Sequence, residues 1–186
     1  MTVQVKRHLI SVERYDQMIA AGIIQEDERL ELLGGEIIEM SPIGIPHAAC
    51  VKRLNRLFSR KLDEQVIIGV QDPIHIDQYS EPQPDIVVLN LRDDYYAGGH
   101  PEPEDILLLV EVADTSLAYD REEKLPRYAQ AGIVEVWIVN LIEQQIEVYL
   151  RPSPQGYQQT AIFNGKQTVI PVAFPQLTLK VSQILG

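Results

Sequence analysis

The sequence can form neither an internal disulfide nor a membrane-spanning helix. It has a single cysteine, Cys50, so no disulfide can close within its 186 residues and packing must hold the fold. Its longest apolar stretches have the length of a strand, far below the roughly 20 residues of a membrane helix. The first eight residues, MTVQVKRH, lack the apolar run of a signal peptide. We therefore expect a soluble, cytoplasmic protein with no membrane partner.

An excess of positive charge is also absent. The 16 lysines and arginines face 27 aspartates and glutamates, which gives a formal net charge of −11. Because general nucleic-acid binders usually present a basic surface, this balance argues against that class and leaves room only for a local basic patch. The glycine pairs at 34–35 and 98–99 lack the context of a nucleotide-binding loop.

The patterning indicates one mixed α/β domain over residues 1–186. The chain is long enough for one well-packed core, and strands alternate with helices, which favours a central mixed sheet flanked by helices. Helices are expected over 12–21, 46–64, 120–131 and 181–185, and strands over 29–33, 36–40, 66–76, 86–90, 106–113, 134–139, 145–150 and 157–163. Asp120 and Glu123 have capping-box spacing, which places the third helix start at Asp120. The segment 92–105 is expected to be a mobile loop.

Two carboxylates stand where apolar strands should exclude them. Asp85 follows Pro84 at the start of one strand, and Glu111 is the one polar residue of the strand 106–113. A buried ionised carboxylate is costly unless a cation, a donor or a metal compensates it. Asp85 could instead cap a turn, and Glu111 could escape to solvent or pair with an arginine. A shared divalent cation is the sharper interpretation, since Mg²⁺ takes one or two protein carboxylates and keeps several waters.

Five stretches carry a family resemblance. They are LLGGEIIEMSP (32–42), PQPD (82–85), VEV (110–112), YDREEKLPRYA (119–129) and the strand segment 132–140. Their order and spacing resemble the PD-(D/E)xK phosphodiesterase superfamily, in its bacterial branch of uncharacterised restriction-endonuclease-like proteins. The resemblance implies a restriction-endonuclease-like core over about 29–150, with the C-terminal strands and short helix appended.

The resemblance also implies roles for individual residues. Asp85 and Glu111 match the two acids and would ligate Mg²⁺ or Mn²⁺, with the Val112 carbonyl as a third ligand. Two residues after Glu111, where the superfamily has lysine, this chain has Ala113. In this branch the lysine role moves to the next helix, which assigns it to Lys124. If Lys124 points away, the site could bind metal without cleaving anything.

Further candidates lie on the hairpin and the long helix. Glu36 and His47 are auxiliary candidates that could face the same cleft. Lys52, Arg56 and Arg60 are spaced i, i+4, i+8, so they form one stripe that could follow a phosphate backbone. The alternative is a solvated face that pairs with acids.

The leading hypothesis is therefore a divalent-metal-dependent, endonuclease-like phosphodiesterase that acts on nucleic acid, with DNA favoured. Its rivals are a catalytically inactive nuclease-fold binding or regulatory module and a purely structural domain whose acids pair with arginines. A homodimer is expected if both strands are cut, because two-fold symmetry suits a duplex.

Overall fold

A six-stranded sheet is the centre of the molecule. The computed structural model describes residues 7–25 and 27–186. The sheet order is β3-β4-β5-β6-β7-β8, with bounds β3 (Val66–Gly69), β4 (Ile86–Asn90), β5 (Ile106–Ala113), β6 (Glu135–Asn140), β7 (Gln145–Leu150) and β8 (Gln159–Asn164). Strands β5 and β6 are parallel and the other neighbours are antiparallel. This confirms the expected mixed sheet.

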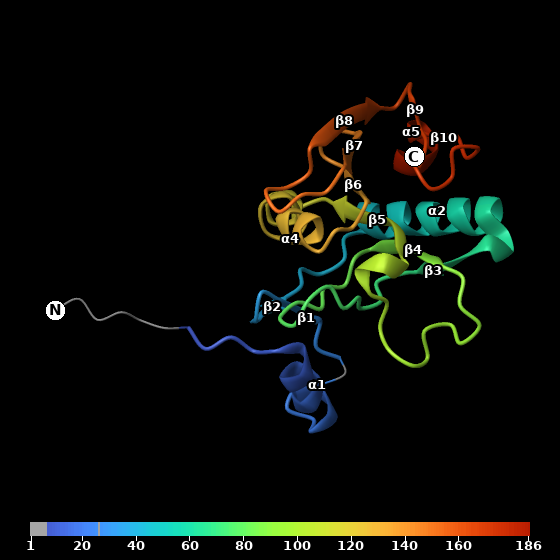
Figure 1. Cartoon of the computed structure of the whole chain (residues 1–186). Helices are drawn as coiled ribbons and strands as arrows, with labels where there is room; N and C mark the ends of the chain where they lie inside the picture. Colours follow the sequence, from blue (N-terminus) through green and yellow to red (C-terminus); the bar gives the residue numbers. More distant parts are fainter. Residues whose placement is uncertain (1–6, 26) are drawn as a thin grey trace.

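Helices cover both faces of that sheet (Figure 1). Their bounds are α1 (Val12–Ala20), α2 (Ile45–Leu62), α3 (Leu117–Tyr119), α4 (Leu125–Gln130) and α5 (Val181–Leu185), with short 3₁₀ turns η1 (Asp63–Gln65) and η2 (Pro103–Asp105) and a π-helical turn η3 (Asp120–Lys124). One apolar core joins α2 and α5 to the sheet, and a second packs Tyr128 of α4 on the opposite face. Double coverage explains why β5 reads as a nearly continuous apolar run. No helix of the described residues combines the length and the apolar character needed to cross a bilayer.

The predicted hairpin is confirmed. Strands β1 (Leu30–Leu33) and β2 (Glu36–Glu39) pair antiparallel across Gly34-Gly35. Both glycines have positive φ, 59° and 80°, which a tight two-residue turn requires and which glycine adopts without a steric penalty. The hairpin and α1 lie at the far end of the molecule from α5 (Figure 1).

Strand β3 is shorter than the sequence suggested. The prediction ran from 66 to 76, but pairing stops at Gly69. Gln71 has φ 58° and Pro73 has no N–H to offer a ladder, so the chain leaves the sheet there. Two short strands, β9 (Thr168–Val169) and β10 (Leu179–Lys180), were not predicted.

The helix expected over 120–131 begins earlier and is interrupted. It starts at Leu117, so Asp120 is not its N-cap, and the capping-box prediction was wrong. The Leu125 N–H bonds to the Asp120 carbonyl five residues back, which makes 120–124 a π turn. Pro126 lies at the first turn of α4, where its missing N–H is tolerated. A proline inside a regular helix would remove a backbone hydrogen bond, and the π turn before Pro126 avoids this. The same turn buries Asp120 and Lys124.

Candidate functional site

Three elements bring the two acids and the lysine together. Asp85 lies directly before β4, Glu111 is on β5 and Lys124 ends the π turn η3. All three line one cavity of about 360 Å³ and are only 8%, 4% and 3% exposed, respectively. Lys124 therefore points inward, which was the condition for it to serve this site. Their catalytic and metal-binding roles remain predictions.

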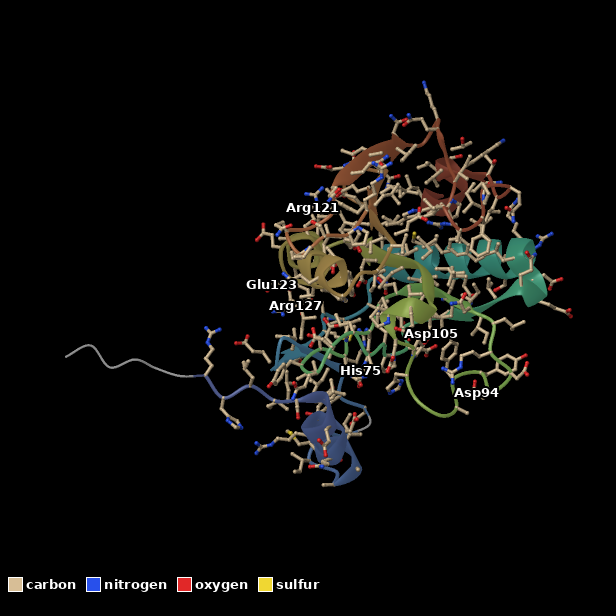
Figure 2. All side chains as sticks on the ribbon, in the orientation of Figure 1. His75, Asp94, Asp105, Arg121, Glu123 and Arg127 are labelled. Atoms are coloured by element: carbon tan, nitrogen blue, oxygen red, sulfur yellow. The ribbon has the colours of Figure 1, made fainter. Side chains whose placement is uncertain are left out.

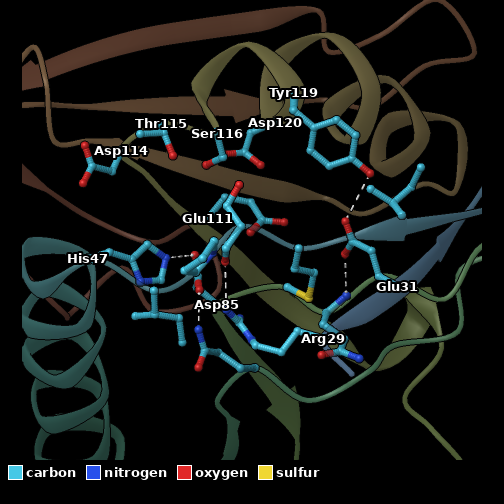
Figure 3. A pocket seen from close by; sticks show the side chains of 18 of the residues that line it. Arg29, Glu31, His47, Asp85, Glu111, Asp114, Thr115, Ser116, Tyr119 and Asp120 are labelled. Carbon is cyan, nitrogen blue, oxygen red and sulfur yellow. Dashed lines mark hydrogen bonds and ion pairs between the residues drawn. The ribbon is translucent and has the colours of Figure 1, made fainter. Parts of the chain in front are cut away.

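Asp85 is held by three donors. His47 Nε2 lies 3.0 Å from Oδ2 (Figure 3). The Val112 N–H donates to the same oxygen at 2.9 Å, and the Gln71 amide donates to Oδ1 at 3.0 Å. Burial alone would raise the pKa of Asp85, but His47 and the other two donors lower it below its ordinary value. Asp85 is therefore ionised at neutral pH and is an available oxygen ligand.

Glu111 is held by one cation and one hydroxyl. Lys124 Nζ is 2.8 Å from Oε1, and the Tyr128 hydroxyl donates to the same oxygen at 2.6 Å. Burial raises the pKa of Glu111 to about 8, with Lys124 opposing the shift. Its second oxygen, Oε2, accepts no hydrogen bond from the described residues. Among residues 7–25 and 27–186, no arginine pairs with Glu111 or Asp85, which removes the arrangement that the structural-domain alternative required.

Lys124 lies among several carboxylates. Besides Glu111 it pairs with Glu31, with 3.3 Å from Nζ to Oε2, and Asp120 is close enough to attract it. Burial lowers the pKa of a lysine, but these acids outweigh burial and hold the pKa of Lys124 well above its ordinary value. The ammonium is therefore charged at neutral pH.

Glu31 is the residue that sequence reasoning missed. It is 2% exposed, and it accepts hydrogen bonds from the Tyr119 hydroxyl at 3.1 Å and the Gln83 N–H at 3.0 Å (Figure 3). The signal was present, because Glu31 interrupts the apolar run Leu30–Leu33 just as Glu111 interrupts its strand. In an alternating hairpin such an acid reads as solvent-facing.

Of the two auxiliary candidates, His47 lies in the cavity and Glu36 does not. His47, at the start of α2, lines the cavity and contacts Asp85, and that hydrogen bond raises its pKa while burial opposes the shift. Glu36 does not line the cavity: its side chain is 51% exposed and pairs with Arg7 at 2.9 Å. The expectation that Glu36 could face the cleft is therefore wrong. Glu31 is paired with Ile38 across the hairpin, and Glu36 lies two residues further along β2, next to the turn. This places Glu36 about 7 Å from the level of the cavity.

The donor set fits a hard divalent cation. Six carboxylates line the cavity, namely Glu31, Glu39, Asp85, Glu111, Asp114 and Asp120, against Arg29 and Lys124 as fixed positive charges. Within the described residues no three His, Cys, Asp or Glu side chains converge closely enough to form a complete cage. Mg²⁺ does not need one, because it keeps several waters beside one or two carboxylates. The Val112 carbonyl stays a predicted ligand.

The basic stripe is exposed along α2. Lys52, Arg56 and Arg60 are solvent-facing and form no ion pair with the described residues. The alternative in which they pair with acids of the same chain therefore loses its support. Helix α2 begins at the cavity with His47, and each four-residue step carries the stripe about 6 Å further from it.

Comparisons with known proteins agree with this geometry. Among solved structures, the chain is similar to a nuclease described as putative, of the DUF820 group from Anabaena variabilis ATCC 29413. The two share 15% sequence identity and a TM-score of 0.73 over 95% of this chain and 97% of that one, which shows a common fold. A comparison with curated proteins gave no match. The sequence profile of Uma2, described as "Putative restriction endonuclease", matches residues 12–182. This match spans most of the sequence and confirms the restriction-endonuclease-like resemblance: the chain belongs to the Uma2 family.

Proposed function

We propose that this protein is a divalent-metal-dependent phosphodiesterase that cleaves DNA. The observation that carries the proposal is the convergence of Asp85, Glu111 and Lys124 in one cavity although 39 residues separate the first from the last. Membership of the Uma2 family supports nuclease-like function. The acidic lining supports the metal requirement, and the basic stripe on α2 supports a nucleic-acid substrate.

Asp85 and Glu111 would hold Mg²⁺ or Mn²⁺. Asp85 is already ionised, and the Lys124 ammonium 2.8 Å from Oε1 favours the ionised form of Glu111 against the effect of burial. When bound, the ion would polarise a phosphate oxygen and acidify a water. His47, Gln71 and the Val112 N–H fix the Asp85 carboxylate in place, so the ligand needs little reorganisation.

Lys124 would act as a cation rather than as a base. Its raised pKa keeps the ammonium protonated, so it orients an attacking water through its N–H groups and neutralises charge that develops on the phosphate. Lys124 could in principle either orient the attacking water or deprotonate it. Deprotonation requires a neutral amine, which the surrounding acids disfavour. Glu31 and Glu111 hold Nζ at the floor of the cavity.

Substrate binding should depend on the metal. Without a divalent cation the six carboxylates of the cavity repel a phosphate, and with one they become its ligands. The stripe Lys52, Arg56 and Arg60 would then guide the strand away from the cavity along α2.

A cleavage assay tests this function. Purified protein is incubated with supercoiled, linear and single-stranded DNA and with RNA, in Mg²⁺, in Mn²⁺ and with a chelator. We expect cleavage of DNA with either ion and none with the chelator. Failure to cut any nucleic acid with either ion would contradict an enzymatic function.

A catalytically inactive nuclease-fold binding module is the second candidate. Ala113, at the position where the superfamily has lysine, is the observation that favours it. Calorimetric titration with Mn²⁺ separates the two, because an enzyme must bind the ion at Asp85 and Glu111 and an inactive module need not. Wild-type binding that Asp85→Asn abolishes supports the enzyme.

Cutting both strands of a duplex would favour a homodimer, which we propose as the active form. Light scattering on a sizing column, with and without DNA, measures it. A monomer in both conditions would contradict this assembly.

A further inference from the structure

A second acidic cavity lies between α1, the segment 75–81 and the loop 99–103. It is about 710 Å³ in volume, and its walls are joined by backbone hydrogen bonds. The Val12 N–H donates to the Gln78 carbonyl at 2.9 Å, and the His75 N–H to the Pro101 carbonyl at 2.9 Å. Figure 2 shows His75 between α1 and the sheet. These ties mean that the cavity is preformed.

The charge in this cavity is of one sign. Five carboxylates line it, from Glu13, Asp16, Asp77, Glu81 and Glu102, and none of its described lining residues is a lysine or an arginine. The neighbouring Asp16 raises the pKa of Glu81 further, after burial, to about 7. Both carboxylates line this cavity, and their negative charges repel each other.

Glu81 is the anomaly of the cavity. Its backbone is fixed by two hydrogen bonds to Leu32, and the residue is only 5% exposed. Its side chain has neither a hydrogen bond nor an ion pair with any described residue. His75 Nε2, in the same lining, is likewise buried and without a partner in that part of the chain. The Glu81 carboxylate opens onto the cavity, where a bound cation would offset the cost that burial imposes on its charge.

The size of the hollow favours an extended ligand over a single ion. Within residues 7–25 and 27–186 no three acidic, histidine or cysteine side chains come close enough to share one. The acids instead line a hollow much larger than an ion. Separated negative charges of this kind suit a ligand with separated positive charges.

We propose that this cavity binds a linear polyamine, with one ammonium group between Glu81 and Asp16 and the others along the remaining acids. Each ammonium carries three donors and no acceptor, which matches carboxylates and an unpartnered imidazole nitrogen. The site is independent of the cavity around Asp85, so it stands or falls apart from nuclease activity.

Calorimetric titration of the full-length protein with spermidine tests the proposal. At 150 mM salt we expect saturable one-site binding that Glu81→Gln weakens by about tenfold or more. The matched control is Glu64→Gln, an exposed acid after α2, which changes the net charge equally and should leave the affinity within about twofold. In parallel, NMR should show the His75 ring signals shifting with spermidine in the wild type.

Two outcomes would overturn the site. One is equal spermidine binding by Glu81→Gln and Glu64→Gln, which would mean general attraction to an acidic protein. The other is binding that leaves the His75 signals unmoved. Far-UV circular dichroism of each variant checks the fold, and Asp16→Asn provides a second variant that should weaken binding in the same direction.

Discussion

The two acidic cavities differ in how their buried carboxylates are compensated. Around Asp85 and Glu111 the structure supplies a lysine, a histidine, a tyrosine and backbone donors. The Glu81 side chain has no hydrogen bond or ion pair with any of the described residues, although His75 lines the same cavity. Burial alone therefore does not define a site, and the pattern of compensation separates the two. The first cavity contains a lysine, Lys124, and suits chemistry on an anionic substrate. The described lining of the second contains no lysine or arginine, and that cavity suits a cationic ligand.

Removing an acid of the first cavity should have the largest effect. Asp85→Asn and Glu111→Gln should each lower DNA cleavage by about 1000-fold or more, since a metal supplies several kcal/mol of transition-state stabilisation. Single-turnover assays in Mg²⁺ measure this loss. Glu64→Gln is the control and should cleave at the wild-type rate. Retained cleavage in both site variants would place the chemistry elsewhere.

Removing the cation of the first cavity should destabilise the protein. Lys124→Met leaves Glu111 and Glu31 buried without their lysine, which typically costs about 3–5 kcal/mol. Urea unfolding at pH 9 measures the loss, and at pH 6 it should shrink because Glu111 can then take up a proton. A second substitution, Glu111→Gln, should restore part of the stability. The exposed Lys61→Met is the control, and an equal loss there would contradict the compensation account.

Neutralising Glu81 in the second cavity should stabilise the protein, in a pH-dependent way. Its pKa is raised from 4.5 to about 7 by burial and then by Asp16, so the folded state holds its proton more tightly than the unfolded state. The wild type therefore loses stability as the pH rises from about 4.5 to about 7. Glu81→Gln should exceed the wild type by on the order of 2 kcal/mol at pH 8, after allowance for solvent screening, and match it at pH 4.5. If the stability difference between Glu81→Gln and the wild type does not vary with pH, Glu81 does not carry an unpaired buried charge in the folded protein.

The basic stripe should give the smallest effect. Arg56→Gln should weaken DNA binding a few-fold and reduce the slope of log affinity against log salt by about 0.9 if one duplex phosphate contact is lost. Fluorescence anisotropy across a salt series, with Ca²⁺ in place of Mg²⁺, measures both. The exposed Arg151→Gln is the control. An unchanged slope in Arg56→Gln would remove the stripe from the DNA path.

The sequence predicted most of the fold because its strands are short, apolar and well punctuated. Glu111 and Asp85 were identifiable for the same reason, since an acid in an apolar strand stands out. Glu31 was not, because an acid in a hairpin strand is expected to face solvent, and its partners Tyr119 and Lys124 come from a distant part of the sequence.

The inward direction of Lys124 was also beyond the sequence. It depends on the π turn at 120–124, whose five-residue hydrogen bond leaves no pattern in the residues themselves. Pro126 gave a hint, because a regular helix through that position would lose a hydrogen bond. The short β9–β10 pair was missed because two residues per strand are too few to show a period.

The most direct test of the central claim is anomalous diffraction from crystals soaked in Mn²⁺. We expect one strong peak within about 2.2 Å of an oxygen of both Asp85 and Glu111, with Lys124 beside the ion's waters. No peak in that cavity at saturating Mn²⁺, or one that contacts neither carboxylate, would contradict it.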